Sequence, residues 1–145
     1  MIVLDTNIVS EFMRADPAPS ALAWLNSIPR GDIWTTSITV AEIAAGIAML
    51  PGGRRRTQLA SGFQKATQGF DERILSFTPA AAMQYGTIVG KRTRAGRPIS
   101  IADAQIAAIV KQAQATLATR NTKDFHGTDV EVIDPWSMNE GSADL

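Results

Sequence analysis

Short apolar runs that alternate with helical patterns constrain the fold of this chain more than any other feature of its sequence. The first run, Ile2–Leu4, has apolar side chains on both faces, which is typical of a central strand in a parallel sheet. Repeated alternation of such strands with helices predicts an α/β fold in which helices cover a mostly parallel, five-stranded sheet. The predicted strands are Ile2–Leu4, Ile33–Thr36, Ile74–Phe77, Thr116–Thr119 and Val130–Ile133.

Apolar residues at helical spacing predict five helices. They centre on residues 18–25, 43–50, 59–70, 81–88 and 106–113. The length of 145 residues is common for one domain. We therefore expect a single domain over residues 1–138 and a polar, frayed tail over residues 139–145.

Few residue types are available for chemistry. The sequence contains no cysteine, which excludes disulfides, thiol nucleophiles and Cys-ligated metal centres. His126 is the one histidine, so a two-histidine ribonuclease mechanism is excluded and a Ser-His-Asp triad would have to use it. Carboxylates are the main groups left for catalysis.

The charged residues balance overall but are unevenly distributed. Fourteen Lys and Arg residues match 14 Asp and Glu residues, so the net charge does not indicate a polyanionic partner. Residues 54–97 nevertheless carry a basic excess, and residues 124–145 carry acids without Lys or Arg. The N-terminus lacks a secretory signal pattern and no apolar stretch suits a membrane span, so we expect a cytoplasmic protein.

Four acidic residues are predicted to lie at one edge of the sheet. Asp5 directly follows the first strand, and Asp124 follows the fourth strand, in a stretch that also suits a turn. Glu42 and Asp103 lie near the starts of two predicted helices. Ligand sites of parallel α/β sheets lie at the carboxyl ends of the strands, so these four positions can meet there.

Helix capping is an alternative explanation for three of these positions. Asp5 suits an N-cap residue, and both Thr39-x-x-Glu42 and Ser100-x-x-Asp103 match the capping-box pattern. Parallel topology places helix starts on one edge in any case, so convergence alone does not separate capping from a shared functional site.

Side-chain direction favours the shared site. Asp103 lies at helical spacing from Ile106 and Val110, and Glu42 lies at helical spacing from Met49, so we expect both acids to point partly inward. Clustered carboxylates need a counter-charge, and ligands that are all oxygen select Mg²⁺ or Mn²⁺ over zinc. Magnesium often completes its coordination with substrate phosphate, so the residues indicate phosphodiester chemistry.

Each of the four acids lies within a short sequence motif. Along the chain, these motifs are residues 2–7 (IVLDTN), 37–46 (SITVAEIAAG), 101–108 (IADAQIAA) and 118–125 (ATRNTKDF). Together with the Asp134-Pro135-Trp136 ending, they resemble the PIN domain of VapC-type proteins, with the greatest similarity to the FitB-like branch. The resemblance spans nearly the whole chain. It implies a PIN-like three-layer sandwich and a Mg²⁺- or Mn²⁺-dependent endoribonuclease that is the toxin of a type II toxin–antitoxin pair.

The resemblance also implies roles for individual residues. Asp5 and Asp103 would be metal ligands. Glu42 would complete the metal site or orient water, and Thr6 would form a hydrogen bond within the site.

Two residues of this chain, Asn121 and Asp124, are candidates for the fourth acidic position of the family. Asn121 stands where many relatives have Asp, and Asp124 stands three residues later, where other relatives have their acid. Asn121 can hydrogen-bond to water or phosphate but cannot neutralise charge, so the number of metal ions stays open. Either Glu42 or Asp124 is expected to position the attacking water or accept its proton.

Basic and aromatic residues are candidates for substrate contact. Arg54, Arg55 and Arg56 begin a predicted helix, where cations are poorly placed for the helix dipole; they are candidate RNA phosphate contacts or a solvated loop. The basic residues within 91–97 lie near a helix C-terminus, where cations are stabilising without a ligand. The three tryptophans are expected to fill the core rather than stack on bases.

The resemblance further implies a homodimer and a small antitoxin that covers a groove near the acids and binds operator DNA. Other enzyme and signalling classes fit less well. A haloacid-dehalogenase phosphatase needs an aspartate at the position of Asn7, and a phosphorylated receiver needs one near Phe77. A PIN-like RNA- or protein-binding module without nuclease activity is the alternative, because Asn121 replaces an acid.

Overall fold

The strands form one parallel sheet with the first strand of the chain at its centre. A computed structural model describes residues 1–138, and its strand order is β3-β2-β1-β4-β5 with every pair of neighbours parallel. This arrangement confirms the predicted α/β fold. The strands are β1 (Ile2–Leu4), β2 (Ile33–Thr36), β3 (Ile74–Leu75), β4 (Thr116–Ala118) and β5 (Glu131–Ile133).

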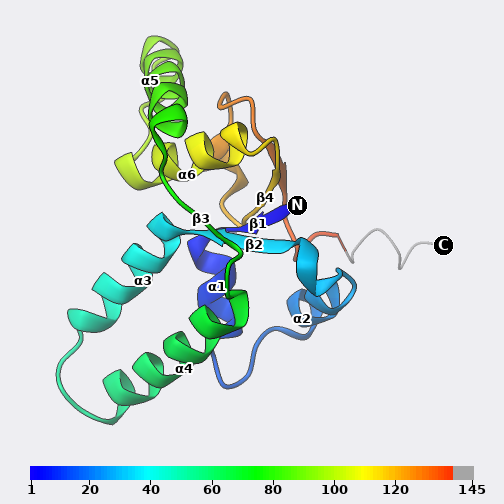
Figure 1. Cartoon of the computed structure of the whole chain (residues 1–145), viewed down its shortest axis with the longest axis vertical. Helices are drawn as coiled ribbons and strands as arrows, with labels where there is room; N and C mark the ends of the chain where they lie inside the picture. The colour runs from blue at the N-terminus through cyan, green and yellow to red at the C-terminus, as the bar shows by residue number, and fades with distance from the viewer. Residues whose placement is uncertain (139–145) are drawn as a thin grey trace.

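Helices cover both faces of the sheet, with α5 and α6 on one side and α1 to α4 on the other (Figure 1). Helix α1 has only seven residues, too few for a clear apolar period, and it is the one α-helix of the described chain that apolar spacing did not predict. The α-helices are α1 (Thr6–Phe12), α2 (Pro19–Asn26), α3 (Ser37–Ala48), α4 (Arg54–Phe70), α5 (Pro79–Arg94) and α6 (Ile101–Gln112), and two short 3₁₀ helices are η1 (Arg30–Asp32) and η2 (Thr122–Phe125).

Two apolar clusters form the core, one on each face of the sheet. Successive strand residues point to opposite faces, so Val3 packs with α5 and α6 while Leu4 packs with α1, α2 and α3. Helix α6 is the most buried helix; its residues 106–110 are all buried. Trp24 lies in the second cluster, and Trp34 and Trp136 pack against the core, as the sequence predicted.

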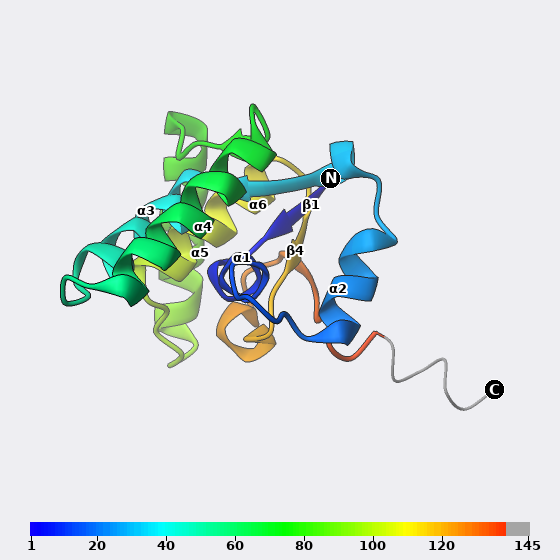
Figure 2. The same cartoon turned by 90° about the horizontal axis from the view of Figure 1, so that it is seen from below.

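Helices α3 and α4 form an exposed arm beside this core. They pack side by side and extend away from the sheet (Figures 1 and 2). Helix α4 contains no buried residue, and Met49 at the end of α3 is 80% exposed. The acid-bearing ends of the strands are therefore flanked by a well-buried helix, α6, and by a largely solvated one, α3.

None of the helices within residues 1–138 has both the length and the apolar character that a membrane crossing requires. The predicted tail over residues 139–145 lies outside the described part of the chain.

Candidate active site

Asp5 is a buried carboxylate at the centre of the carboxyl edge. It follows β1 directly and is 4% exposed. Its Oδ1 atom accepts a 2.8 Å hydrogen bond from the Thr6 N–H, so the N-cap interpretation of Asp5 is correct. Its Oδ2 atom accepts hydrogen bonds from the Thr119 hydroxyl at 2.7 Å and from the Asn7 amide at 3.3 Å. Capping therefore accounts for one oxygen only, and the second oxygen belongs to a separate polar network.

Burial raises the pKa of Asp5 from its ordinary value of 3.8 to about 6. The hydrogen bonds from Thr119 and Thr6 lower this pKa, while the negative charges of Asp103 and Glu42 add smaller increases. The charges of Asp103 and Glu42 thus act on the Asp5 carboxylate, although the three residues are far apart in sequence.

Glu42 reaches the site from the exposed arm. Its Oε1 atom accepts a 2.7 Å hydrogen bond from the Thr6 hydroxyl, which also lies 3.3 Å from the Thr39 hydroxyl. Thr6 therefore connects Glu42 to Asp5, because its hydroxyl bonds to Glu42 and its main-chain N–H bonds to Asp5. The expectation that this face of α3 points partly inward is wrong, because its residues, including Met49, are exposed, although the Glu42 carboxylate still contacts Thr6.

Thr39 does not cap a helix with Glu42. The N-cap of α3 is Thr36, whose hydroxyl accepts a 3.1 Å bond from the Thr39 N–H, so the helix begins three residues earlier than the capping-box pattern assumed. At α6, the capping-box pattern correctly predicts the N-cap. Ser100 is the N-cap residue, and its hydroxyl accepts a 3.2 Å hydrogen bond from the Asp103 N–H.

Asp103 is half-buried in the first turn of α6. The neighbours at helical spacing, Ile106 and Val110, are fully buried, as the sequence predicted. Burial raises the pKa of Asp103, and the carboxylates of Asp124 and Glu42 raise it further.

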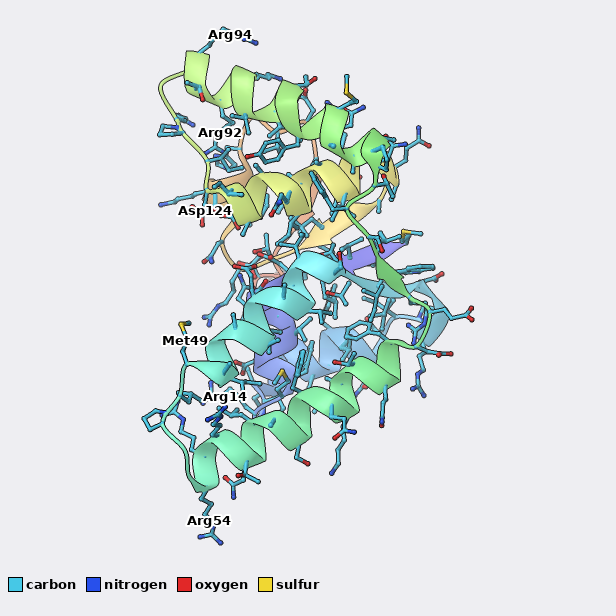
Figure 3. The ribbon with its side chains drawn as sticks, turned by 60° about the vertical axis from the view of Figure 1, so that its left-hand side comes forward. Arg14, Met49, Arg54, Arg92, Arg94 and Asp124 are labelled. Carbon is cyan, nitrogen blue, oxygen red and sulfur yellow. The ribbon has the colours of Figure 1, made fainter. Side chains whose placement is uncertain are left out.

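Asn121 and Asp124 lie in the loop between β4 and β5, where Asp124 belongs to the short 3₁₀ helix η2 and Asn121 precedes it. Both side chains are exposed, and the main-chain N–H of Asn121 donates a 3.1 Å hydrogen bond to the Thr119 hydroxyl. Figure 3 shows Asp124 near one end of α6, on the same side as Arg92. The Asp124 carboxylate contributes to the raised pKa of Asp103.

The four acids share an environment but do not form a ready-made metal cage. Within residues 1–138, no ion pair involves any of them, and no three acidic or histidine side chains are close enough to hold one ion as placed. Their donor chemistry fits a hard divalent cation, because every donor is oxygen and Asp5 keeps a free lone pair beside its three hydrogen bonds. A cation of this kind would have to draw the exposed carboxylates inward.

The structure separates the arginine run from the acids. Arg54 lies at the outer end of α4, far from Asp124 in Figure 3, and Arg55 and Arg56 follow it on the same exposed turn. The basic residues within 91–97 are exposed with one exception: Arg92 is buried.

Sequence reasoning missed several residues that organise the site. Thr119 and Asn7 hold Asp5, and Thr39 contacts Thr6. The available signal for Thr119 was its place at the end of the predicted strand Thr116–Thr119. The position of Arg92 had no such signal, since its neighbours in sequence are solvated cations.

A parallel sheet flanked by helices on both faces, with acidic residues at its carboxyl edge, defines an α/β fold of the kind expected for a PIN domain. The family model described as "PIN domain" matches residues 2–131, and the chain belongs to the PIN domain family.

Similar proteins place the chain within the VapC-type branch of the family. It is 39% identical to Toxin FitB of Neisseria gonorrhoeae over 137 residues, which cover 94% of this chain and 99% of the relative. It is 34% identical to VapC ribonuclease Y4jK of Sinorhizobium fredii over 137 residues, 94% of this chain and 98% of the relative. The solved structure of FitAB bound to an IR36 DNA fragment contains a chain that matches with a TM-score of 0.86 at 39% identity, covering 94% of this chain and 96% of the other.

Proposed function

We propose that this chain is the toxin of a type II toxin–antitoxin pair and acts as a divalent-metal-dependent endoribonuclease. The observation that carries the proposal is that a PIN fold holds four acids, Asp5, Glu42, Asp103 and Asp124, without an ion pair within residues 1–138, and that Glu42 contacts Thr6, the neighbour of Asp5. The similarity to a VapC ribonuclease supports RNA as the substrate, and the similarity to Toxin FitB supports the biological role.

Mg²⁺ or Mn²⁺ is the cofactor that suits this donor set. Asp5 and Asp103 are the proposed ligands, because they are the acids that the fold buries and whose pKa values it raises. When bound, the ion supplies Lewis-acid polarisation of the phosphodiester and a more acidic water. It also offsets the mutual repulsion of the carboxylates.

The residues of the chain position the reacting groups. Thr119 and Asn7 fix the Asp5 carboxylate in one orientation. The Thr6 hydroxyl engages one Glu42 oxygen and leaves the other to orient the attacking water. Glu42 or Asp124, both exposed, accepts the proton of that water. Hydrolysis by water needs no 2′-hydroxyl nucleophile, so the preference for RNA comes from binding contacts.

The proposed partners are a small antitoxin and a second copy of this chain, with operator DNA bound through the antitoxin. The structures of FitAB on DNA support the antitoxin. A hollow of about 430 Å³ between α1, α2 and α4, lined by Phe12, Leu25 and Phe70 among others but by none of the four acids, offers apolar surface for a partner away from the acidic edge.

Cleavage of total cellular RNA by the purified chain, with cut sites mapped by sequencing, tests the proposal. We expect cuts in the presence of Mn²⁺ or Mg²⁺ and none with EDTA. Asp5→Asn should lose these cuts, while Asp129→Asn should retain them because Asp129 is an exposed acid paired with Lys91 outside the site.

RNA binding without cleavage in any divalent ion would overturn the nuclease assignment and favour the alternative of a PIN-like binding module. Growth arrest on expression, relieved by the product of a short neighbouring gene, tests the toxin role separately.

A further inference from the structure

Arg92 and Asp5 are the two buried charged residues of the described chain. Arg92 is 7% exposed, although it lies in the last turns of α5 among solvated basic residues. A buried charge is costly unless hydrogen bonds compensate it, so each contact of this guanidinium constrains what it does.

The Arg92 guanidinium is held by main-chain carbonyls from two loops. Its Nη1 atom donates to the Asp124 carbonyl at 2.7 Å and to the His126 carbonyl at 2.8 Å. Its Nε atom donates to the Arg97 carbonyl at 2.7 Å. Arg92 thereby joins the end of α5, the segment leading to α6 and the loop that carries Asp124.

No carboxylate of the described chain lies within ion-pair distance of Arg92. Its charge is compensated instead by the main-chain carbonyls of Arg97, Asp124 and His126. An arginine placed only to close a helix would have no need to be buried beside the acidic edge.

We propose that Arg92 is a positioning residue that sets the place of the Asp124 carboxylate relative to Asp103 by holding the main chain at Asp124 and His126. The proposal rests on the proposed function for its metal site, but the anchoring of the loop does not depend on it. Figure 3 shows Arg92 and Asp124 side by side although 32 positions separate them.

The neighbouring residue Lys91 provides a matched control. Its Nζ atom lies 2.9 Å from Asp129 Oδ1, so it ties the same helix to the same loop through an exposed ion pair. Lys91→Ala removes this ion pair and leaves Arg92 unchanged. Arg92→Gln removes the positive charge and the guanidinium N–H groups that donate to the three main-chain carbonyls. Arg92→Lys keeps the charge but not these N–H groups, and it keeps the test possible if Arg92→Gln does not fold.

Amide hydrogen exchange of the metal-free full chain is the first measurement. The amides of Asp124, His126 and Thr128 are hydrogen-bonded within the loop. We expect their exchange to accelerate at least about 10-fold in Arg92→Gln and Arg92→Lys, and by less than about 2-fold in Lys91→Ala. Unchanged exchange in the Arg92 variants would overturn the proposal.

Mn²⁺ titration followed by electron paramagnetic resonance is the second measurement. We expect Arg92→Gln to weaken Mn²⁺ binding about 10-fold, because a displaced Asp124 carboxylate no longer adds its negative charge beside the ion that Asp5 and Asp103 hold. The substitution should have no further effect in an Asp124→Asn background. An equal loss in both backgrounds would show that Arg92 does not act through Asp124 and would overturn the proposal. A parent chain that binds no Mn²⁺ would overturn the proposed function, and hydrogen exchange alone would then decide whether Arg92 fixes the loop.

Discussion

The two halves of the acidic edge differ in how firmly the fold holds them. Asp5 follows the central strand and Asp103 lies on α6, whose core-facing residues are fully buried. Glu42 lies on the exposed arm and Asp124 lies in a loop, and both side chains are solvated. The buried half is therefore set when the core forms, while the exposed half depends on a few hydrogen bonds and on a ligand.

This difference predicts unequal losses of activity when single acids are changed. Asp103→Asn should reduce RNA cleavage by more than about 100-fold, because it removes a fixed metal ligand. Glu42→Gln should cost about 10-fold, because the Thr6 hydroxyl can still bond to the amide oxygen. Cleavage rates measured over a range of Mn²⁺ concentrations test both values.

Excess Mn²⁺ should recover activity in Glu42→Gln more than in Asp103→Asn. Equal losses in the two variants, or a larger loss in Glu42→Gln, would contradict the division into a fixed and an adaptable half.

The second prediction concerns the free energy of unfolding of the metal-free chain. Because the folded pKa of Asp5 is raised to about 6, its neutral form stabilises the fold below pH 4, and this contribution is lost as the pH rises through 6. Ionised Asp5 then costs about 3 kcal/mol at neutral pH. Asp5→Asn should therefore raise stability by about 1–3 kcal/mol at pH 7.5, with little difference from the parent at pH 4.

Urea unfolding across this pH range measures the effect of Asp5→Asn, and added Mn²⁺ should reduce it by stabilising the parent alone. Asp129→Asn is a control of opposite sign. The Lys91 hydrogen bond lowers the pKa of Asp129, so its ionised form stabilises the fold above the ordinary pKa and this contribution is lost as the pH falls.

A third prediction concerns Thr6, which connects the two halves. Thr6→Val removes the hydroxyl that contacts Glu42 and Thr39 and keeps the side-chain shape. We expect cleavage to fall about 10-fold, because a positioning hydrogen bond of this kind is worth about 1–1.5 kcal/mol. Thr87→Val, at an exposed threonine of α5, is the matched control. The loss should be small in a Glu42→Ala background, where the Thr6 hydroxyl has no partner at this position, if Thr6 acts through Glu42.

The same division explains what the sequence could predict. Asp103 was placed on an inward face because bulky Ile106 and Val110 share its spacing, and large apolar residues mark a buried face. Glu42 was misplaced because alanine and glycine dominate its side of α3, and small residues fit buried and exposed faces equally well. Apolar periodicity thus predicts the half of the site that the core fixes.

The hydrogen bonds of the site were less accessible to sequence reasoning. The link between Thr119 and Asp5 joins residues 114 positions apart, and no local pattern indicates such a pair. Arg92 has the same sequence environment as its exposed neighbours, and only the return of the chain after β4 buries it. Contacts between distant segments require the folded topology.

The smallest expected effect concerns RNA contact at the buried half of the site. The Arg120 guanidinium lies 4.3 Å from the ring centre of Trp136, and its main-chain N–H donates to Asn7, next to the Asp5 network. The Trp136 ring holds the exposed Arg120 guanidinium near Asn7 and Asp5, where it can bind a phosphate of the RNA. Arg120→Ala in an Asp103→Asn background should weaken RNA binding about 3- to 5-fold and reduce its salt dependence. Arg54→Ala, at the far end of the arm, should have a smaller effect on fluorescence anisotropy titrations. A larger effect at Arg54 would shift RNA contact to the arm and assign substrate binding to the exposed half.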